Sequence, residues 1–282
     1  MYKKAKRVYD KSVMISWKVE NPNRLLSEIK NKCSGTYTTV DLRWALEHNR
    51  CFVNKKMETF ASSPVKKGDL ITFWPEQKPT FCTEKSRILY EDDFLLVYNK
   101  PPFLSSENLE KLTQCTLVHR LDRDTTGALL LAKTPSIQTA LEKQFKERSI
   151  EKEYLALVEG CPGKSGIIKG KIGPLYKREG AVIWGMSSAG QWSQTQWKCI
   201  QIKENRSLLL CVPLTGRTHQ IRVHLKHLGY PIIGDYTYGP RTLKAGIFRP
   251  MLHAYRLTFT HPHSGQRLTL KAALPTDFAH IG

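Results

Sequence analysis

The apolar positions near the start of the chain predict two short helices. From residue 23 onward, Leu25, Leu26 and Ile29 are spaced for one face of a helix. Thr38 and Thr39 offer an N-cap to a second helix, because apolar residues with a helical spacing follow them directly. We therefore expect a pair of helices before residue 50.

Short strands are expected on either side of these helices. Residues 51–56 predict a strand that ends in a turn. The segment Val65-Lys66-Lys67-Gly68-Asp69 predicts another turn, and a strand is expected after it at residues 70–73. A further strand at 13–17 is expected near the end of a basic N-terminal stretch. This part of the chain is thus predicted to be a small α/β unit.

The rest of the chain has many short apolar runs and two clear helical patterns. Strands are predicted at residues 95–98, 128–132, 154–158 and 208–212. One helix is predicted to begin at Thr134-Pro135, where the threonine is the N-cap and the proline is the first helical residue. The other is predicted at 218–228, before Gly229 at the C′ position. Because strands outnumber helices, we predict an α+β fold with a mixed, largely antiparallel sheet.

Proline content and the change of pattern suggest where one domain ends and the next begins. Residues 74–80 carry two prolines and little apolar content, which is typical of a linker. We predict a basic extension at 1–17, a small α/β domain at 18–74, a linker at 75–84 and a larger domain at 85–282.

The charge of the chain points to a polyanionic partner. Its 282 residues include 44 Lys and Arg against 25 Asp and Glu, a net charge of +19. Nucleic acid is the commonest polyanion that proteins bind. The alternative is a basic surface that is simply well solvated.

The cysteines and the hydropathy pattern bear on the compartment. The seven cysteines are odd in number and include no C-x-x-C pair, which argues against a disulfide framework and a cysteine-rich zinc site. We find no window with the roughly 20 apolar residues that a membrane span needs, and no secretory signal. We therefore expect a soluble, cytoplasmic protein.

The polar segment Val118-His119-Arg120-Leu121-Asp122-Arg123-Asp124-Thr125-Thr126-Gly127 precedes an apolar strand. A carboxylate between two arginines has its ionised form favoured when the charges are close. Such a carboxylate suits a nucleophile or a charge stabiliser better than a general acid. The alternative is an ion-paired turn, and the residues alone do not decide between the two.

Three further segments stand out along the second domain. Tyr98-Asn99-Lys100-Pro101 ends a predicted strand. Glu153 to Gly160 alternates so that Tyr154 shares a face with two apolar residues, a position usually found in a core. Gly216-Arg217-Thr218-His219-Gln220-Ile221-Arg222-Val223-His224 begins the second predicted helix, whose first N–H groups are free to meet a phosphate beside Arg217.

In this order, these segments resemble the RluA-type pseudouridine synthases, whose signature His-Arg-Leu-Asp-x-x-Thr-Thr/Ser-Gly is complete here. The resemblance covers about residues 87–275. It implies isomerisation of uridine in RNA, with Asp122 as the catalytic nucleophile. It also implies that Tyr154 stacks on the target base and removes its C5 proton, and that Arg222 pairs with Asp122. Asp124 would face the opposite way on an extended chain.

The first domain resembles the S4 RNA-binding module through Leu42-Arg43, Val53-Asn54 and the turn at 65–69. Trp44 and Glu47 interrupt the basic helix that is usual in that module. The alternative is a small α+β cap that only packs against the larger domain.

The two resemblances together imply a set of RNA-contacting residues. In the second domain these are Lys100, His119, Arg120, Arg217, His219 and Leu252, and in the S4-like domain Arg43, Lys55 and Lys67. Among them, Leu252 is expected to pack against the target base, and Arg120 to fill the gap that the extruded nucleotide leaves.

We expect neither a cofactor nor a metal. An isomerisation needs no redox cofactor or ATP, and the chain has no P-loop and no glycine-rich dinucleotide motif. His224 and His227 are spaced to share a helix face, but no third ligand lies near them in the sequence.

Several alternatives remain open at this point. Large-subunit ribosomal RNA is the substrate expected from an S4-like domain before an RluA-type domain, and transfer RNA is the alternative. A non-catalytic RNA-binding or ribosome-assembly protein could share the fold. A glycosidase normally needs a spaced pair of carboxylates, and nothing in the sequence singles out a partner for Asp122. We expect a monomer.

Overall fold

The computed structural model describes residues 14–33, 35–178, 181–242 and 246–279. The chain divides into two compact units. Unit 1 comprises Met1–Thr80 and Arg241–Phe248, and unit 2 comprises Phe81–Pro240 and Arg249–Gly282. Residues 1–13 of the predicted basic extension lie outside the described residues.

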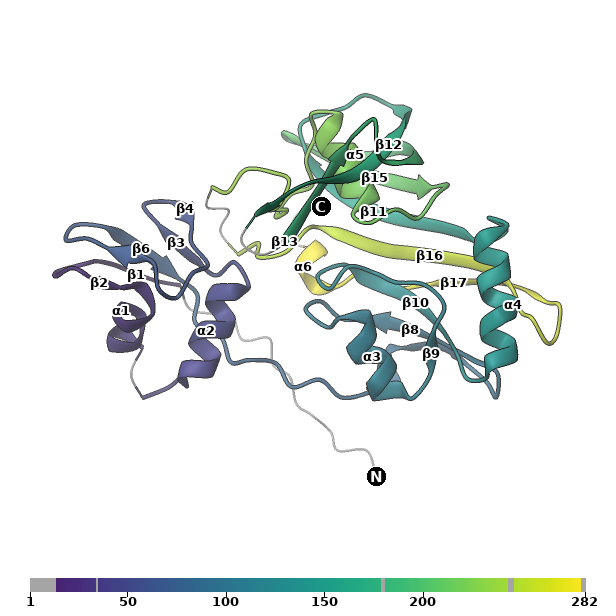
Figure 1. Cartoon of the computed structure of the whole chain (residues 1–282), viewed down its shortest axis with the longest axis horizontal. Coiled ribbons are helices and arrows are strands. Elements are labelled where there is room, and N and C mark those ends of the chain that lie inside the picture. Colours follow the sequence, from purple (N-terminus) through teal and green to yellow (C-terminus); the bar gives the residue numbers. More distant parts are fainter. Residues whose placement is uncertain (1–13, 34, 179–180, 243–245, 280–282) are drawn as a thin grey trace. The chain divides into compact units, whose positions relative to one another are not determined.

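Unit 1 is built on a four-stranded sheet with strand order β1-β6-β3-β4 and two helices (Figure 1). Its elements are β1 (Ile15–Lys18), β2 (Asn23–Arg24), α1 (Leu25–Lys32), α2 (Thr39–Glu47), β3 (Cys51–Val53), β4 (Lys56–Met57), β5 (Pro64–Val65) and β6 (Leu70–Phe73). A separate two-stranded ladder joins β2 to β5. The two helices predicted for this part are confirmed.

Local capping fixes the start of α2. The Thr38 hydroxyl accepts a hydrogen bond from the Asp41 N–H, and the Asp41 carboxylate accepts one from the Thr38 N–H at 2.9 Å. This reciprocal capping box satisfies two backbone donors that a helix start otherwise leaves free. The buried side of the helix, with Leu42 and Leu46, then packs into the core of unit 1.

The returning segment Arg241–Phe248 completes unit 1. The Phe248 ring meets the Trp74 ring edge-on at 5.3 Å between centroids, and the Arg50 guanidinium lies 4.3 Å from the Phe248 ring centroid. The units therefore differ from the predicted domains at two points. Unit 1 extends to Thr80, within the predicted linker, and it includes a segment that we had placed in the larger domain.

Unit 2 is dominated by an eleven-stranded sheet. Its strands are β7 (Ile88–Glu91), β8 (Leu95–Lys100), β9 (Thr116–Leu117), β10 (Thr126–Ala132), β11 (Glu151–Glu159), β12 (Ser165–Arg178), β13 (Ala181–Met186), β14 (Gln191–Lys203), β15 (Arg206–Pro213), β16 (Leu252–Thr260) and β17 (Arg267–Lys271). The main path is β13-β12-β14-β15-β11-β16-β10-β8-β7, with β17 on β16 and β9 on β10. Among the described strand pairs of this sheet only β10 and β16 are parallel, so the predicted α+β class with a mixed, largely antiparallel sheet is confirmed.

Helices cover both faces of this sheet (Figure 1). They are η1 (Lys85–Arg87), α3 (Ser106–Thr113), α4 (Pro135–Lys146), α5 (Gln220–His227) and α6 (Thr276–Ala279). Alternate residues of β8 point to opposite faces: Leu95 packs in the cluster that contains α4 residues, and Leu96 in the cluster that contains Leu109 of α3. The site described below lies at the end of this doubly covered region.

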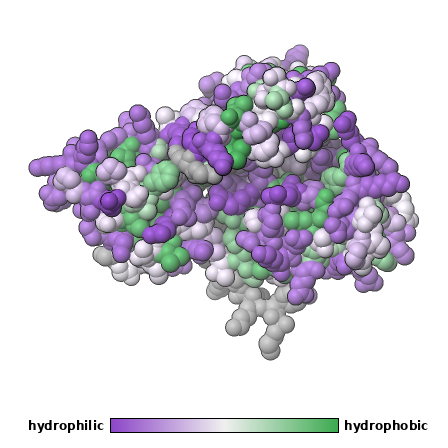
Figure 2. Space-filling model, in the orientation of Figure 1, coloured by the Kyte–Doolittle hydropathy of each residue, from purple (hydrophilic) through white to green (hydrophobic). Residues whose placement is uncertain are grey.

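The helix predicted at 218–228 begins two residues later than expected. His219 has φ +55°, in the left-handed region, so helical geometry starts only at Gln220. The predicted C-terminus holds, with Gly229 at φ +90° following the helix. In the described part of the chain no helix is long and apolar enough to cross a bilayer, and the face seen in Figure 2 is mainly hydrophilic.

Candidate active site

Asp122 lies in the loop between β9 and β10. A turn closed by the Thr125 N–H and the Asp122 carbonyl (3.0 Å) leads the chain into β10. There Gly127 has φ +113°, and a side chain at this position would meet the Ala254 carbonyl oxygen at 2.2 Å. Glycine is therefore required where β10 and β16 run side by side, and this close packing fixes the loop that carries Asp122.

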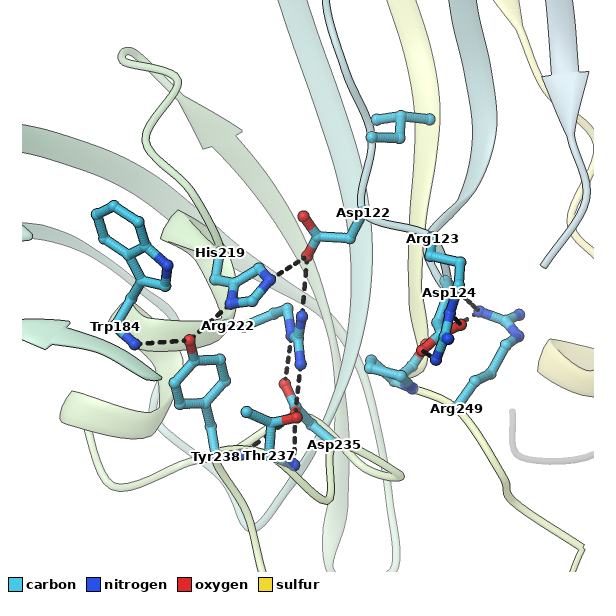
Figure 3. A network of polar contacts seen from close by, with 12 residues as sticks. Asp122, Arg123, Asp124, Trp184, His219, Arg222, Asp235, Thr237, Tyr238 and Arg249 are labelled. Atoms are coloured by element: carbon cyan, nitrogen blue, oxygen red, sulfur yellow. Dashed lines mark hydrogen bonds and ion pairs between the residues drawn. The ribbon is translucent and has the colours of Figure 1, made fainter. Parts of the chain in front are cut away.

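The Asp122 carboxylate is held through one of its two oxygens (Figure 3). Arg222 Nη1 donates to Asp122 Oδ2 at 3.0 Å, and His219 Nε2 lies 3.8 Å from the same oxygen. Both partners come from the α5 region, about 100 residues further along the chain. Asp122 Oδ1 makes no hydrogen bond to any described residue, and the side chain is 28% exposed.

The arginines beside Asp122 in the sequence are not its partners. Arg120 forms an ion pair with Glu107 at 2.6 Å, and Arg123 pairs with Asp124 at 2.9 Å. Of the two possibilities that the residues left open, a local ion pair of Asp122 with its neighbouring arginines is not formed, because the loop turns and directs these side chains to Glu107 and Asp124. Asp124 does point away from the site, although the reason is this turn and not an extended backbone.

Arg222 is buried and fully engaged. Its Nε and Nη2 donate to the two oxygens of Asp235 at 2.7 and 2.9 Å, which leaves Nη1 for Asp122. Burial alone would lower the pKa of Arg222, but the charges of Asp235 and Asp122 raise it above its ordinary value. Sequence reasoning missed the role of Asp235. The available signal was an arginine on a buried helix face, which needs a carboxylate partner.

Tyr154 lies in β11, where the pairing with β16 shifts register between Glu153 and Tyr154. Burial, together with the negative charge of Asp122, raises the pKa of Tyr154 well above its ordinary value. The hydroxyl therefore keeps its proton at neutral pH in the free protein. The predicted Asp122, Tyr154 and Arg222 thus interact electrostatically within unit 2.

Lys100 is not placed to meet RNA. It is fully buried, and its ammonium donates to the carbonyls of Pro101, Leu104 and Arg123 at 3.1, 2.8 and 2.9 Å. The predicted RNA contact was wrong, because all three donors are used to hold backbone next to Asp122. Burial lowers the pKa of Lys100 to about 7.

His119 and Leu252 also have structural positions. His119 Nε2 accepts the Leu130 N–H at 3.0 Å, its ring lies 4.8 Å from the Phe145 ring, and burial lowers its pKa to about 3. Leu252 is 3% exposed in β16. In the free protein His119 is hydrogen-bonded to its own sheet and Leu252 is buried, and their contact with RNA stays a prediction.

The remaining predicted RNA-contacting residues are accessible. Arg120 is exposed, and Arg217 is half-buried with its guanidinium held by the Trp192 carbonyl and the Gln191 side chain at 3.1 and 2.6 Å. His219 is half-buried beside Asp122. Arg43, Lys55 and Lys67 are exposed in unit 1. Their contact with RNA stays a prediction.

His224 of α5 is held by hydrogen bonds to the sheet. His224 is fully buried, with Nε2 2.9 Å from the Ser193 hydroxyl and Nδ1 2.9 Å from the Thr195 hydroxyl. Burial lowers the pKa of His224 to about 4, so it is neutral at physiological pH. Both ring nitrogens of His224 are therefore committed to holding α5 on the sheet.

The sheet of unit 2 and the aspartate–arginine site at its loop end define the class of protein. The fold is that of a pseudouridine synthase, since the chain is similar to the solved structure of "Human RNA Pseudouridylate Synthase Domain Containing 4", with a TM-score of 0.58, 26% identity, and 69% of this chain and 91% of that chain covered. The family model described as RNA pseudouridylate synthase matches residues 91–227. The chain belongs to this family, in its RluA-type branch.

The chain is also similar to two named pseudouridine synthases. It is 37% identical over 223 residues to "Ribosomal large subunit pseudouridine synthase D" of Nitrosomonas europaea, covering 69% of this chain and 64% of that protein. It is 39% identical over 216 residues to "Ribosomal large subunit pseudouridine synthase C" of Yersinia pestis, covering 68% of this chain and 67% of that protein. The chain therefore spans about two thirds of the length of these relatives.

Proposed function

We propose that this protein is an RNA pseudouridine synthase that isomerises specific uridines in structured RNA, with large-subunit ribosomal RNA as the substrate. The observation that carries the proposal is the state of Asp122. One carboxylate oxygen is fixed by Arg222 at 3.0 Å, while the other has no partner among the described residues and belongs to a partly exposed side chain. An oriented carboxylate with one open oxygen suits nucleophilic attack on a nucleotide.

In the proposed reaction Asp122 attacks the target nucleotide and the bond between N1 of uracil and C1′ breaks. The uracil turns within the site, and its C5 forms the new bond to C1′ as the aspartate is released. The C5 proton is then removed and N1 gains a proton, so the product has the same atoms as the substrate. Arg222 orients the Asp122 carboxylate before the attack.

Tyr154 is proposed to stack on the uracil and to remove the C5 proton. A tyrosine with a raised pKa is a poor base at the start of such a reaction. However, the charge of Asp122 is one of the two causes of that raised pKa. When Asp122 forms a covalent bond it loses this charge, so Tyr154 becomes easier to ionise at the stage where a base is needed.

RNA binding is proposed to rest on the basic surface. His219 lies beside Asp122, Arg120 belongs to the same loop as Asp122, and Arg217 precedes α5. Arg43, Lys55 and Lys67 lie in unit 1, which we propose to be S4-like. Extruding a uridine costs a few kcal/mol, and phosphate contacts offset this cost. Binding should therefore weaken as salt increases.

The substrate is proposed from the relatives, whose names specify the large ribosomal subunit. Transfer RNA is the alternative substrate. We propose a cytoplasmic monomer that needs no nucleotide cofactor. The alternative class, a non-catalytic RNA-binding or ribosome-assembly protein, is disfavoured because a protein that had lost activity would not need Asp122, Tyr154 and Arg222 together.

The test is to incubate the protein with ribosomal RNA and with transfer RNA, both lacking pseudouridine, and to map pseudouridine chemically. Asp122→Asn is the matched variant, and Asp124→Asn is the control for a nearby carboxylate outside the site. Product from the wild type and Asp124→Asn but not from Asp122→Asn is expected. Equal product from Asp122→Asn would remove Asp122 from its role. Tight binding without product on either RNA would favour the non-catalytic alternative.

A further inference from the structure

The segment that forms β12, β13 and β14 is strongly basic. Residues 161–203 contain seven Lys and Arg and a single acidic residue, Glu179. They also hold half of the large apolar side chains that the described surface exposes, among them Ile167 at 54% and Trp192 at 50%. Basic side chains interleaved with exposed aromatic and aliphatic ones are typical of nucleic-acid-binding surfaces.

The two faces of the β12–β14 ladder are unlike. One face, which includes Ile168, is buried, and its Ser193 and Thr195 hydroxyls bind His224 of α5. The opposite face, which we call the open face, is solvent-accessible. It is formed by Ser165, Ile167, Lys169 and Lys171 of β12 and by Trp192, Gln194, Gln196 and Lys198 of β14.

The open face is arranged in cross-strand rows. Lys171 stands opposite Trp192, Lys169 opposite Gln194, and Lys198 lies at the far end of the ladder opposite Ser165. Within the described residues, these three lysines form no ion pair, so their charges are not neutralised by a neighbouring carboxylate. A polyanion with stackable groups matches this surface better than an acidic protein does, since the row offers an indole and amides besides the lysines.

We propose that the open face is a second RNA-binding surface, which binds structured RNA away from the site at Asp122. The proposal rests on the proposed function and deepens it. The lysines contact phosphates, Trp192 stacks on an unpaired base or a sugar, and the glutamines donate to backbone oxygens. Because the open face is the side of the ladder opposite α5, RNA held here is not the extruded uridine itself.

The test compares two triple charge reversals. Lys169→Glu/Lys171→Glu/Lys198→Glu alters the open face, and Lys111→Glu/Lys143→Glu/Lys146→Glu makes the same charge change on α3 and α4. The probe is a labelled RNA hairpin without uridine, so binding is measured apart from modification. The first variant should bind about 10- to 100-fold more weakly and show a salt slope smaller by about three. The second should stay within about threefold of the wild type.

The outcomes separate this proposal from the proposed function. Equal loss in both triple variants would show a general charge effect and overturn the open face as a surface. A wild type that makes pseudouridine while the open-face variant binds normally would also overturn it. A wild type that neither binds nor modifies RNA would instead remove the proposed function. Trp192→Phe, which keeps a ring, should lose less affinity than Trp192→Ala.

A second, independent observation concerns Tyr238. Its hydroxyl lies 2.6 Å from His219 Nδ1 and accepts the Trp184 N–H at 3.3 Å (Figure 3). Its ring lies 5.0 Å beneath the Arg222 guanidinium. Tyr238 therefore touches both of the residues that face Asp122.

These contacts select one tautomer of His219. A carboxylate that can only accept favours a proton on the ring nitrogen that faces it. The Tyr238 hydroxyl, whose oxygen also accepts from the Trp184 backbone N–H, can then donate its proton to His219 Nδ1, with the single ring proton of His219 on Nε2. That nitrogen faces Asp122 Oδ2 at 3.8 Å. Burial and the nearby charge of Arg222 lower the pKa of His219, so the ring is neutral and its tautomer matters.

The geometry points to Tyr238 as a positioning residue, which orients His219 through its hydroxyl and Arg222 through its ring. This proposal also rests on the proposed function. Tyr238→Phe removes the hydroxyl and keeps the ring, whereas Tyr238→Leu removes both. Tyr90→Phe is the control, because Tyr90 donates a comparable hydrogen bond to Asp92 at 2.9 Å outside the site.

Nitrogen chemical shifts of His219 report the tautomer in the free protein, without any substrate. Tyr238→Phe should mix the tautomers and lower kcat about tenfold with KM within about twofold, and Tyr238→Leu should lower kcat about 100-fold. An unchanged His219 tautomer in Tyr238→Phe would overturn the orienting role, as would altered tautomers with unchanged kcat. If the wild type makes no pseudouridine, the proposed function fails, and the chemical shifts still decide the orientation of His219.

Discussion

Two buried arginines of unit 2 each bind an aspartate through Nε and Nη2, but the third nitrogen, Nη1, has a different kind of partner in each. Arg222 binds Asp235 with Nε and Nη2 at 2.7 and 2.9 Å, and Arg249 binds Asp277 with the same two nitrogens at 2.6 and 2.7 Å. In each case Nη1 is left over. That of Arg222 reaches a carboxylate at 3.0 Å, and that of Arg249 reaches the Pro250 carbonyl at 2.9 Å and two further carbonyls at 3.4 Å.

The difference lies in what the remaining donor holds. Arg249 is 2% exposed, and its donors bind backbone carbonyls and the Asp277 carboxylate. It therefore holds a loop, the start of β16 and α6 together. Arg222 holds one end of a side chain that still faces solvent through its other oxygen. The same two-pronged pair therefore stabilises the chain in one place and prepares a reactive group in the other.

The largest expected effect comes from neutralising Asp122, the carboxylate that Nη1 of Arg222 binds. Asp122→Asn should lower kcat by at least about 1,000-fold, since the amide is not a nucleophile. The melting temperature should change by no more than a few degrees, because Arg222 keeps Asp235. Single-turnover assays and thermal melts would be made on the same preparation. A large loss of stability would mean that Asp122 is part of the core and not of the site.

The next largest effect is expected from replacing Arg249, and it should appear in the stability of the protein. Arg249→Met leaves three buried carbonyls and the Asp277 carboxylate without their donor, so the free energy of unfolding should fall by about 3 kcal/mol. Urea denaturation at neutral pH measures this change. The folded fraction should retain kcat within about tenfold of the wild type. A kcat loss as large as that of Asp122→Asn would break the distinction between the two arginines.

A smaller pair of effects should follow from neutralising each carboxylate partner. Asp235→Asn should lower kcat about 10- to 100-fold, because Arg222 loses the charge that fixes its orientation toward Asp122. Asp277→Asn should leave kcat unchanged and lower the free energy of unfolding by about 1 kcal/mol, since Asp277 is 38% exposed. The two variants measured side by side sharpen the comparison. Equal effects on kcat would remove the special role of Asp235.

The last expected effect is a pH dependence of stability near Arg249. Burial, together with the charge of Arg249, lowers the pKa of His253 to about 4. The unfolded chain therefore binds a proton that the folded protein does not, and stability is lost as the pH falls below about 6.5 toward 4. The free energy of unfolding should therefore be about 1.4 kcal/mol lower at pH 5.5 than at pH 7.5 because of His253. In His253→Gln the free energy of unfolding should fall less steeply between pH 7.5 and pH 5.5. An equally steep fall would show that another group causes the pH dependence.

Much of the fold could be predicted from the sequence, and so could the pairing of Asp122 with Arg222. Caps such as Thr38 and Thr134 act over three residues, and both predicted helices begin where these residues place them. The family resemblance of residues 216–224, and not the residues next to Asp122, named Arg222 as its partner. Local sequence carries such information because capping and motif residues act within a few positions of the chain.

What could not be predicted was the direction of individual side chains. Lys100 belongs to a matched motif, yet it is buried under three carbonyls. The charges beside Asp122 in the sequence suggested a local ion pair, yet Arg120 and Arg123 pair with Glu107 and Asp124, because the loop turns at this point. The long ladder of β12 and β14 was also missed, since its open face mixes lysines with apolar residues and so lacks a clean alternation.

The packing of Phe248 into unit 1 has a consequence for biosynthesis. The rings of Trp74 and Phe248 and the guanidinium of Arg50 form one contact group, so the first unit is incomplete until residue 248 of 282 has been translated. Domains often fold in order as they leave the ribosome. Here the N-terminal unit has to wait, with its Trp74 edge uncovered, while nearly all of the second unit is made. A nascent chain halted before residue 241 should therefore be more sensitive to proteases within residues 1–80 than the finished protein.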